Sequence, residues 1–570
     1  MKITIAKTAG FCMGVRRAVD MVLDAANHAD EPIYTYGPLI HNPQVLEMLE
    51  DKEIFRLDTI PEKGEGLVLI RAHGVPPRDE EALKQAGFTV MNATCPRVVR
   101  VQVIINRYAK QGYHTIIIGD EKHPEVVGLL GYSRDNGVTV TSMDQIKELP
   151  AYENAVVVAQ TTQNTAFYDE VKEWCSTHRP HYKVFDTICG STEKRQSEIR
   201  ELADSHDRVI VVGGKQSGNT KRLAQVAKET GTPAVHIETV SEINFKEYKD
   251  AKSIAITAGA STPNWIINDT CAQVDRNLKK EATGLGKLSQ GIELILQTNL
   301  MLSLGAFGLT YACSAYQGLE RIFPHAALAM FYVFAMQTVN NIVTIKSDTY
   351  NHPGRAAFHM KYRPWLVGLA VGSGLAGLIL AANIGWGSFT ILLIMSLLGL
   401  TYNLEIIPSW FSRKKLRGIK DIPGSKTIFV AAAWGMVTAV FPAIGNGGGV
   451  LSLVPAFCFS GGLIFARTAF FDIAAIQGDR IAGKETLPIL LGVEKSLRLV
   501  SMVLAANVLL PILAWLAGLV PWTGLFLALV PLYMFVLVHL FKKDKLLSGW
   551  QAEFLVESSF LISGVLAIVV

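Results

Sequence analysis

Three cysteines, Cys12, Cys95 and Cys189, stand at matching places in a repeated pattern and are the residues best suited to chemistry. Each is followed by an amphipathic, helix-like stretch and then by a strand-like stretch that ends at a glycine, namely Gly37, Gly119 or Gly213. Structural zinc takes four closed ligands, whereas three thiolates with no nearby fourth suit an iron–sulfur cluster that keeps one iron open for substrate. Because buried free cysteines are common, this hypothesis depends on the threefold register.

A second set of polar residues follows the strand-like stretches of the same three copies. His41, His123 and Ser217 come four residues after the three glycines, and a second strand-like stretch in each copy also ends in polar residues. Imidazoles, hydroxyls and amides beside main-chain N–H groups at glycine-rich turns suit a phosphate or diphosphate. A single histidine after a strand is commonly just hydrogen-bonded, so the repetition again carries the interpretation. The predicted set is His41, His73, His123, Thr161, Thr162, Ser217, Asn219 and Ser261.

One further candidate residue is acidic and is not part of the repeated pattern. Glu125 lies two residues beyond His123, near the start of the next predicted helix, where its side chain can face the same crevice. A carboxyl group beside a metal cluster and a bound diphosphate is a candidate proton donor, because anionic surroundings raise its pKa. The alternative is an ordinary acidic residue in the first turn of a helix, which is common.

The elements that must position these residues form three copies of one βα unit of roughly 90 residues. Loops at the carboxyl ends of parallel strands converge on one crevice. Three equivalent copies about a pseudo-threefold axis therefore bring the three cysteines to a common centre. We assign this α/β domain to residues 1–282.

The second half of the 570-residue chain has a different composition. Long stretches there carry no charge, and the mean hydropathy of +0.27 is too high for a purely soluble protein of this length. Since a membrane span needs roughly 20 apolar residues, these stretches hold eight spans, and the end of the chain from about residue 558 supplies a ninth. Residues 283–570 are thus predicted to be an all-α polytopic membrane domain. The uncharged stretches are 294–318, 322–345, 364–404, 427–466 and 499–541.

Basic residues of this half gather in alternate loops, including "RKKLRGIK" and "FKKDK". By the positive-inside rule these loops, and the domain that precedes the first span, are cytoplasmic. The net charge of +4 therefore reflects membrane topology rather than binding of nucleic acid. We expect a multi-pass protein of the cell inner membrane with its N-terminal domain in the cytoplasm.

In order and spacing, the motifs of the first half resemble the LytB family, also called IspH, of 4-hydroxy-3-methylbut-2-enyl diphosphate reductases, which act last in the non-mevalonate isoprenoid pathway. The resemblance covers residues 1 to about 280, and so many ordered motifs make it specific. They include "GFCMGVRRAVD", "RAHGVPP", "ATCPRV", "GDEKHPEVVG", "DTIC", "SGNTKRL" and "TAGASTP".

This resemblance implies a trefoil of three α/β units around a [4Fe-4S] cluster held by the three cysteines. It places Thr161 near the reacting hydroxyl, makes Glu125 the proton donor, and implies reductive dehydroxylation with electrons from a ferredoxin or flavodoxin. Gly218 stands where a second serine is often found, and main-chain contacts can survive that change. The implied diphosphate pocket comprises His41, His73, His123, Ser217, Asn219 and Ser261.

The second half resembles the UbiA superfamily of intramembrane prenyltransferases, through its nine predicted spans and two polar clusters on cytoplasmic loops. Aspartates in such loops hold Mg²⁺, which binds the diphosphate of the prenyl donor and helps it to leave. The candidate residues here are Asn340, Asp348, Asp472 and Asp479. Three further aspartates usual in that family correspond to Asn341, Thr344 and Ala475, so the resemblance supports the fold better than the activity.

Two alternatives stay open for the membrane half. It is either a non-catalytic membrane anchor for the reductase, or the whole chain is a transporter with a cytosolic redox-sensing domain. A transporter predicts paired intramembrane charges and an inverted repeat, and the charge-free spans argue against it.

Overall fold

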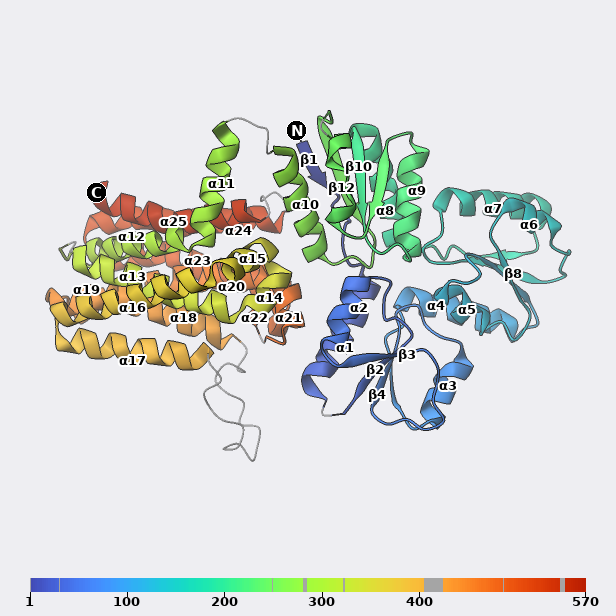
Figure 1. The fold of residues 1–570 in the computed structure, drawn as a ribbon, viewed down its shortest axis with the longest axis horizontal. Coiled ribbons are helices and arrows are strands. Elements are labelled where there is room, and N and C mark those ends of the chain that lie inside the picture. Colours follow the sequence, from blue (N-terminus) through green and yellow to red (C-terminus); the bar gives the residue numbers. More distant parts are fainter. Residues whose placement is uncertain are drawn as a thin grey trace. The chain divides into compact units, whose positions relative to one another are not determined.

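The structure is a computed structural model that describes residues 2–29, 31–248, 250–279, 284–320, 323–403, 424–484, 486–543 and 549–569. The chain forms two compact units, Met1–Glu281 and Ala282–Val570. Figure 1 shows strands and helices in the first unit and helices in the second. The predicted boundary between residues 282 and 283 lies outside the described residues.

The first unit consists of three lobes, each built on a four-stranded parallel sheet. The strand order is the same in all three, which confirms the predicted threefold repetition of α/β units. The first sheet has the order β3 (Ile54–Leu57), β2 (Ile33–Tyr36), β4 (Leu67–Ile70), β5 (Thr89–Asn92). The second has the order β7 (Gly137–Val140), β6 (His114–Ile118), β8 (Ala155–Ala159), β9 (Lys183–Val184). The third has the order β11 (Ala234–Ile237), β10 (Arg208–Val212), β12 (Ser253–Ala258), β1 (Lys2–Ile5).

The third sheet is closed by the first strand of the chain. Strand β1 pairs in parallel with β12, with Ile3 opposite Ile254, and so takes the place that β5 and β9 take in the other lobes. Each of the three repeated cysteines follows this last strand of a sheet. A linear sequence repeat that begins at a cysteine does not reveal that the first and last segments share one lobe.

Two of the central strands, β4 and β8, are short and wholly apolar because helices cover both faces of each sheet. All residues of β4 and β8 are buried. The helices of this unit are α1 (Met13–His28), α2 (Pro43–Glu50), α3 (Pro77–Gln85), α4 (Pro96–Ala109), α5 (Pro124–Leu130), α6 (Met143–Glu148), α7 (Thr165–His178), α8 (Gly190–Ser205), α9 (Gly218–Glu229) and α10 (Asn264–Lys279).

The described residues of the second unit form a bundle of helices with one shared apolar core. They are α11 (Gly284–Gln297), α12 (Leu300–Tyr316), α13 (Phe323–Val343), α14 (Ile345–Asn351), α15 (Pro353–Lys361), α16 (Arg363–Ile384), α17 (Trp386–Asn403), α18 (Ser425–Gly435), α19 (Phe441–Gly445), α20 (Val450–Ala474), α21 (Ile476–Ile481), α22 (Leu487–Leu491), α23 (Val493–Leu516), α24 (Leu529–Lys542) and α25 (Trp550–Val569).

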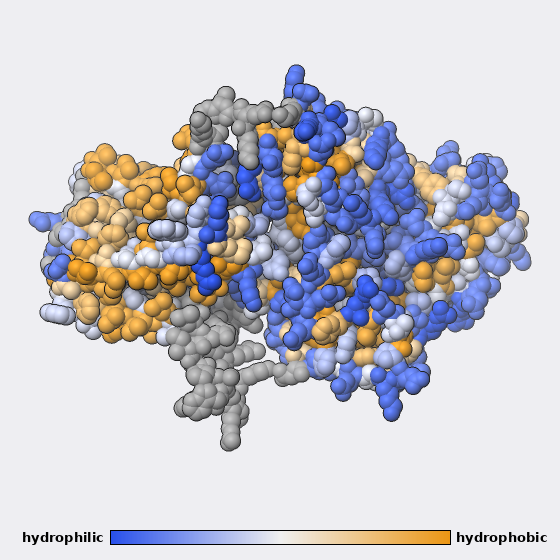
Figure 2. All heavy atoms as spheres, in the orientation of Figure 1, coloured by the Kyte–Doolittle hydropathy of each residue, from blue (hydrophilic) through white to orange (hydrophobic). Residues whose placement is uncertain are grey.

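Seven helices among the described residues are long and apolar enough to cross a membrane, or eight if the bent pair α11–α12 is one span. The second span predicted in the stretch 364–404 falls on α17, whose apolar part, Trp386–Thr401, is shorter than the candidate spans. Large apolar side chains on the outside of the bundle are exposed, including Trp365 and Trp386 at 77% each. Figure 2 shows this apolar surface in orange, in contrast to the mostly hydrophilic surface of the first unit. Most of the basic loop predicted at 405–426 lies outside the described residues.

Candidate active sites

The three repeated cysteines share one structural position, the residue that caps the N-terminus of a helix. Cys12 caps α1, Cys95 caps α4 and Cys189 caps α8. The Cys12 Sγ accepts a hydrogen bond from the Val15 N–H at 3.5 Å. The positive end of a helix dipole favours a thiolate over a thiol, so all three positions are suited to metal-binding thiolates.

The same cysteines lie close together although they are far apart in sequence. A Cβ on Gly14, two residues after Cys12, would collide with the Cys95 side chain. Burial raises the pKa of the Cys95 thiol, and the negative charges of Cys12 and Cys189 raise it further. All three side chains are partly exposed free thiols. The structure therefore brings the predicted cysteines to a common centre.

A buried guanidinium that the sequence analysis did not single out lies beside this centre. Arg195, on α8 and 5% exposed, donates hydrogen bonds to the carbonyl oxygens of Gly10 at 2.7 Å and Ala258 at 3.1 Å. Its charge interacts favourably with Cys12 and Cys189. Three soft thiolates at helix N-termini with a buried cation alongside form a donor set that fits an anionic iron–sulfur cluster.

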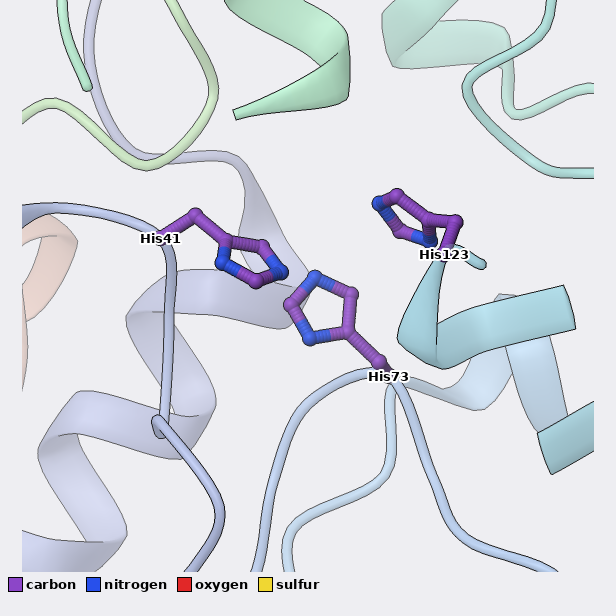
Figure 3. A group of neighbouring side chains, drawn as sticks. All are labelled: His41, His73 and His123. Atoms are coloured by element: carbon purple, nitrogen blue, oxygen red, sulfur yellow. The ribbon is translucent and has the colours of Figure 1, made fainter. Parts of the chain in front are cut away.

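Three histidines from separate loops face one another in the first unit (Figure 3). The ring centroids lie 4.8 Å apart for His41 and His73, 5.7 Å for His41 and His123, and 5.4 Å for His73 and His123. His123 caps α5, and its Nδ1 accepts a hydrogen bond from the Glu125 N–H at 3.1 Å. A neutral His123 therefore carries its proton on Nε2.

Buried donors around these rings lack partners within the described structure. Burial without a hydrogen bond costs about 1–3 kcal/mol per group, so such a concentration of polar atoms indicates a ligand site. The unpartnered buried atoms include His41 Nε2, His73 Nδ1, Asn42 Nδ2 and Asn219 Nδ2.

The electrostatics of the histidine cluster favour an anion. Burial lowers the pKa of His123 to about 4 and also lowers those of His41 and His73, and Arg71 lowers all three further. The ring nitrogens lie within 4.8 Å of one another, which is close enough to hold a metal ion. A cation there would be repelled by Arg71, whereas a diphosphate would be attracted by it and would accept from the unpaired donors. Arg71 stands two residues before His73, and that proximity to a predicted ligand was its only sequence signal.

The hydroxyl residues predicted for the same pocket extend this anion site. Ser217 caps α9, and the Ser261 hydroxyl donates to the Ser217 Oγ at 3.3 Å or to the His41 carbonyl at 3.1 Å. A Cβ on Gly218 would lie 3.4 Å from the His123 ring, so glycine leaves that ring room. The Thr162 hydroxyl instead accepts from the Gln160 side chain at 3.0 Å.

Glu125 is fully buried and bonded to the other predicted catalytic residue. Its carboxylate accepts from the Thr161 N–H at 2.6 Å and from the Thr161 hydroxyl at 2.8 Å. Burial raises the pKa of Glu125 to about 7, although the bonds from Thr161 oppose that rise. The Thr161 carbonyl accepts from the Cys189 N–H at 3.0 Å. A single residue therefore separates this carboxyl group from the cysteine centre.

In the second unit, the predicted aspartates lie on neighbouring helices. Asp348 is on α14, Asp472 near the end of α20 and Asp479 on α21, and the charges of Asp348 and Asp472 both act on Asp479. Helices α14 and α21 are joined by the bond from Asn351 Nδ2 to Asp479 Oδ1 at 3.2 Å. Asn340 is half-buried near the end of α13.

The prediction that the spans are free of charge is wrong for α20, which includes Arg467 and Asp472, and for the last span. Helix α25 begins at residue 550 rather than near 558, so Glu553 and Glu557 lie within a candidate span. Glu553 pairs with Arg355 on α15, and Glu557 pairs with Arg467 on α20 at 2.5 Å. Pairing offsets the cost of holding these charges among apolar helices. Absence of paired charges is therefore no longer an argument against a transporter.

Comparison with known proteins gives two separate matches. The profile described as LytB protein matches residues 3–275, and that described as UbiA prenyltransferase family matches residues 297–560. The chain is 40% identical over 275 residues to the 4-hydroxy-3-methylbut-2-enyl diphosphate reductase of Aquifex aeolicus (strain VF5), covering 48% of this chain and 95% of that protein. Identity to the reductase of the same name from Citrifermentans bemidjiense is 39% over 275 residues, covering 48% and 97%. A solved apo structure of a UbiA homolog from Aeropyrum pernix K1 is 17% identical, covers 47% of this chain and 97% of its own, and has a TM-score of 0.37.

The fold and its sites define an α/β protein with a three-cysteine centre, joined to a polytopic helical membrane protein. The chain belongs to the LytB family through its first unit and carries a UbiA prenyltransferase family domain in its second. It is a membrane protein by its UbiA domain and its apolar helices.

Proposed function

We propose that the first unit is a 4-hydroxy-3-methylbut-2-enyl diphosphate reductase, which removes the substrate hydroxyl as water and gives isopentenyl and dimethylallyl diphosphate. The observation that supports it most is the juxtaposition in one unit of three helix-capping cysteines with a buried cluster of unpaired imidazole and amide donors. The reaction consumes two electrons and two protons. The name of the reaction, and its direction as a reduction, come from relatives about 40% identical to this chain.

The diphosphate would bind at the histidine cluster. His41 and His73 have a ring nitrogen free to donate, Ser217 and Asn219 lie at the N-terminus of α9, and Ser261 lies in the turn after β12. Arg71 supplies a permanent positive charge that the neutral imidazoles lack. Charge-assisted hydrogen bonds of this kind hold and orient the phosphate end, which leaves the hydroxylated end to reach the cysteine centre.

Glu125 would deliver the proton that lets the hydroxyl leave as water. With a pKa of about 7 it is partly protonated at neutral pH, as a general acid must be. Thr161, bonded to both carboxylate oxygens through its N–H and hydroxyl, keeps the group oriented toward the site. The second proton goes to one of two carbons of the substrate, which accounts for two products.

Cys12, Cys95 and Cys189 would hold a [4Fe-4S] cluster, which supplies electrons and a Lewis-acidic iron when bound. The three helix N-termini and Arg195 stabilise negative charge at this place. We infer that a ferredoxin or flavodoxin provides the reducing equivalents, because no GxGxxG fingerprint for a nicotinamide or flavin occurs in residues 1–282. The GSGLAG string at residues 372–377 lies inside the apolar helix α16 and does not follow a strand.

Anaerobically purified protein tests this function. One [4Fe-4S] cluster per chain and formation of both five-carbon diphosphates are expected, and Cys95→Ser should lose cluster and turnover together. A Cys95→Ser protein with a full cluster and normal turnover contradicts the assignment.

For the second unit we propose transfer of a prenyl group from a prenyl diphosphate to an acceptor, at the polar cluster of Asp348, Asp472 and Asp479. The protein would lie in the cell inner membrane with its reductase unit in the cytoplasm, as the basic loops predict. The family resemblance implies Mg²⁺ at this cluster, but the residues present depart from the usual ligand set. Asn341, Thr344 and Ala475 stand where three further aspartates are usual, and Asp479 lies 3.6 Å from the Lys484 ammonium group.

Incorporation of a radiolabelled prenyl diphosphate into membrane lipids or quinone precursors tests the second activity. Wild-type protein should incorporate label, and Asp472→Ala should reduce incorporation at least tenfold while the reductase rate is unchanged. No incorporation by the wild type across a broad panel of acceptors would favour the membrane-anchor alternative.

A further inference from the structure

We propose that the second unit holds the diphosphate of its donor through the ammonium groups of Lys484 and Lys426 and without a divalent cation. The inference rests on the proposed prenyl-diphosphate function of this unit. It follows from the hydrogen bonds made by the aspartates that are present and by the residues that replace the family's other aspartates.

At two of the three positions where the UbiA family usually has an aspartate, Asn341 and Thr344, the side chain is already hydrogen-bonded to other residues. Asn341, 3% exposed, donates from Nδ2 to Asn299 Oδ1 at 3.0 Å and accepts at Oδ1 from Gln337 Nε2 at 2.9 Å. Thr344 donates to Asp348 Oδ2 at 3.2 Å. The third position, Ala475, has no ligand atom. Mg²⁺ needs near-octahedral oxygen ligands, and these positions offer it little.

Lys484 occupies the space that a metal ion would need beside Asp479. Its Nζ donates to Ser347 Oγ at 2.6 Å and lies 3.6 Å from Asp479 Oδ1. That carboxylate oxygen also accepts from Asn351 Nδ2 at 3.2 Å. Asp479 is 4% exposed, so its oxygens are engaged inside the protein rather than held open for an ion.

Charge balance leads to the same conclusion. Three carboxylates, those of Asp348, Asp472 and Asp479, are accompanied by two lysines, Lys426 and Lys484, whose charges act on Asp479. Lys426 immediately precedes Thr427, whose hydroxyl donates to Asp472 Oδ2 at 3.2 Å, so Lys426 adjoins the same carboxylates. Two of the three negative charges are thus offset without a metal, and a divalent cation would have to compete with two ammonium groups.

An ammonium group can serve a diphosphate directly. Lysine carries three donors, and in Lys484 two of them are directed at Ser347 and Asp479. The third is available, and the side chain is 28% exposed and so can be reached. Lysine binds phosphate as a point charge, and a charge-assisted hydrogen bond would stabilise the leaving diphosphate.

The test uses full-length protein in detergent and binding of radiolabelled geranylgeranyl diphosphate, with EDTA or with excess Mg²⁺. His123→Ala is introduced throughout to silence the diphosphate site proposed for the first unit. Binding should differ less than about twofold between the two conditions and weaken about tenfold or more in Lys484→Met and in Lys426→Met, since each removes a charged donor. Lys495→Met, at an exposed lysine on α23, is the matched control and should bind as the parent does.

Binding that requires Mg²⁺, or that is unaffected by both lysine substitutions, would overturn the proposal. If Lys484→Met fails to fold, the EDTA comparison on the parent protein still tests whether binding needs a divalent cation, and the Lys426→Met variant still tests the role of the lysines. Loss of binding in Asp472→Ala together with a Mg²⁺ requirement would reject this proposal and leave the prenyl-diphosphate function of the unit standing. Absence of any binding to the parent protein in either condition would reject the prenyl-diphosphate function as well.

Discussion

Burial shifts the pKa values of acidic and basic residues in the reductase unit in opposite directions. Glu125 is held partly protonated, and the three histidines are held neutral, because burial disfavours the charged form of each group. A carboxyl group that can give a proton and neutral imidazoles that can donate hydrogen bonds to phosphate oxygens are what an acid-assisted reaction on a diphosphate requires.

Glu125→Gln should keep the cluster and the affinity for substrate but lower kcat by about 10² to 10⁴, because only proton delivery is removed. The wild-type rate should fall as the pH rises above about 7, where the acid loses its proton, and this descending limb should be absent from the residual activity of the variant. Steady-state kinetics from pH 6 to pH 9 at saturating substrate measure both effects. Wild-type turnover in Glu125→Gln would show that Glu125 is an ordinary acidic residue in the first turn of a helix.

Arg71→Met should raise KM about tenfold with little change in kcat, because Arg71 supplies charge for binding and does not reach the reacting carbon. Arg71→Lys should recover part of the affinity. Arg78→Met, at a side chain 87% exposed, is the control and should behave as wild type. An unchanged KM in Arg71→Met would exclude the residue from the site.

At the level of elements, the cysteine centre depends on how the N-termini of α1, α4 and α8 pack against one another. Gly14 in the first turn of α1 lies against Cys95, which caps α4, and no space is left there for a side chain. Contact between these two helix ends positions two of the three thiols. Loss of that contact should affect the metal centre even though no ligand is changed.

Gly14→Ala should reduce the iron and sulfide bound per chain and destabilise the first unit by about 1–3 kcal/mol, as overpacking does in other cores. Chemical analysis of iron and sulfide and thermal unfolding measure the two effects. Gly291→Ala on α11 is the matched control because a Cβ there meets nothing within 4 Å. Full iron content in Gly14→Ala would show that α4 can shift without losing the centre.

For the whole molecule, the division into two compact units predicts that the two proposed activities are separable. Effects of substitutions in sites that share no contacts are additive. The fusion would place the reductase that makes five-carbon units on the same membrane as an enzyme that uses a longer donor, and another enzyme must elongate those units in between. Colocalisation with that enzyme is therefore the expected benefit, rather than direct channelling.

The double variant Glu125→Gln with Asp472→Ala should show the reductase rate of Glu125→Gln alone and the prenyl-transfer rate of Asp472→Ala alone. A fragment that ends at residue 281 should retain the wild-type kcat/KM for the reductase to within about twofold. Anaerobic reductase assays and label incorporation on the same preparations give the four rates. A reductase rate that depends on Asp472 would show that the units are coupled.

Local pattern in the sequence was sufficient to predict much of this protein. The register of Cys12, Cys95 and Cys189, the glycine-ended strands and the long uncharged stretches each reflect local rules: strand and helix periodicity, turn chemistry, and the length of a membrane span. The α/β repeat, the helical membrane half and the three candidate cysteine ligands follow from these rules, whereas the candidate aspartates of the membrane half were predicted from the family resemblance.

Tertiary structure decided what periodicity does not encode. Pairing of β1 with β12, the bond from Lys484 to Ser347, and the placement of Arg71 and Arg195 beside their sites all join residues far apart or poorly distinguished in sequence. Charged residues look alike in a linear pattern, and only packing determines which are buried and which face water. The same holds for Glu553 and Glu557, since a carboxylate within a span is tolerated only where the fold brings an arginine to it.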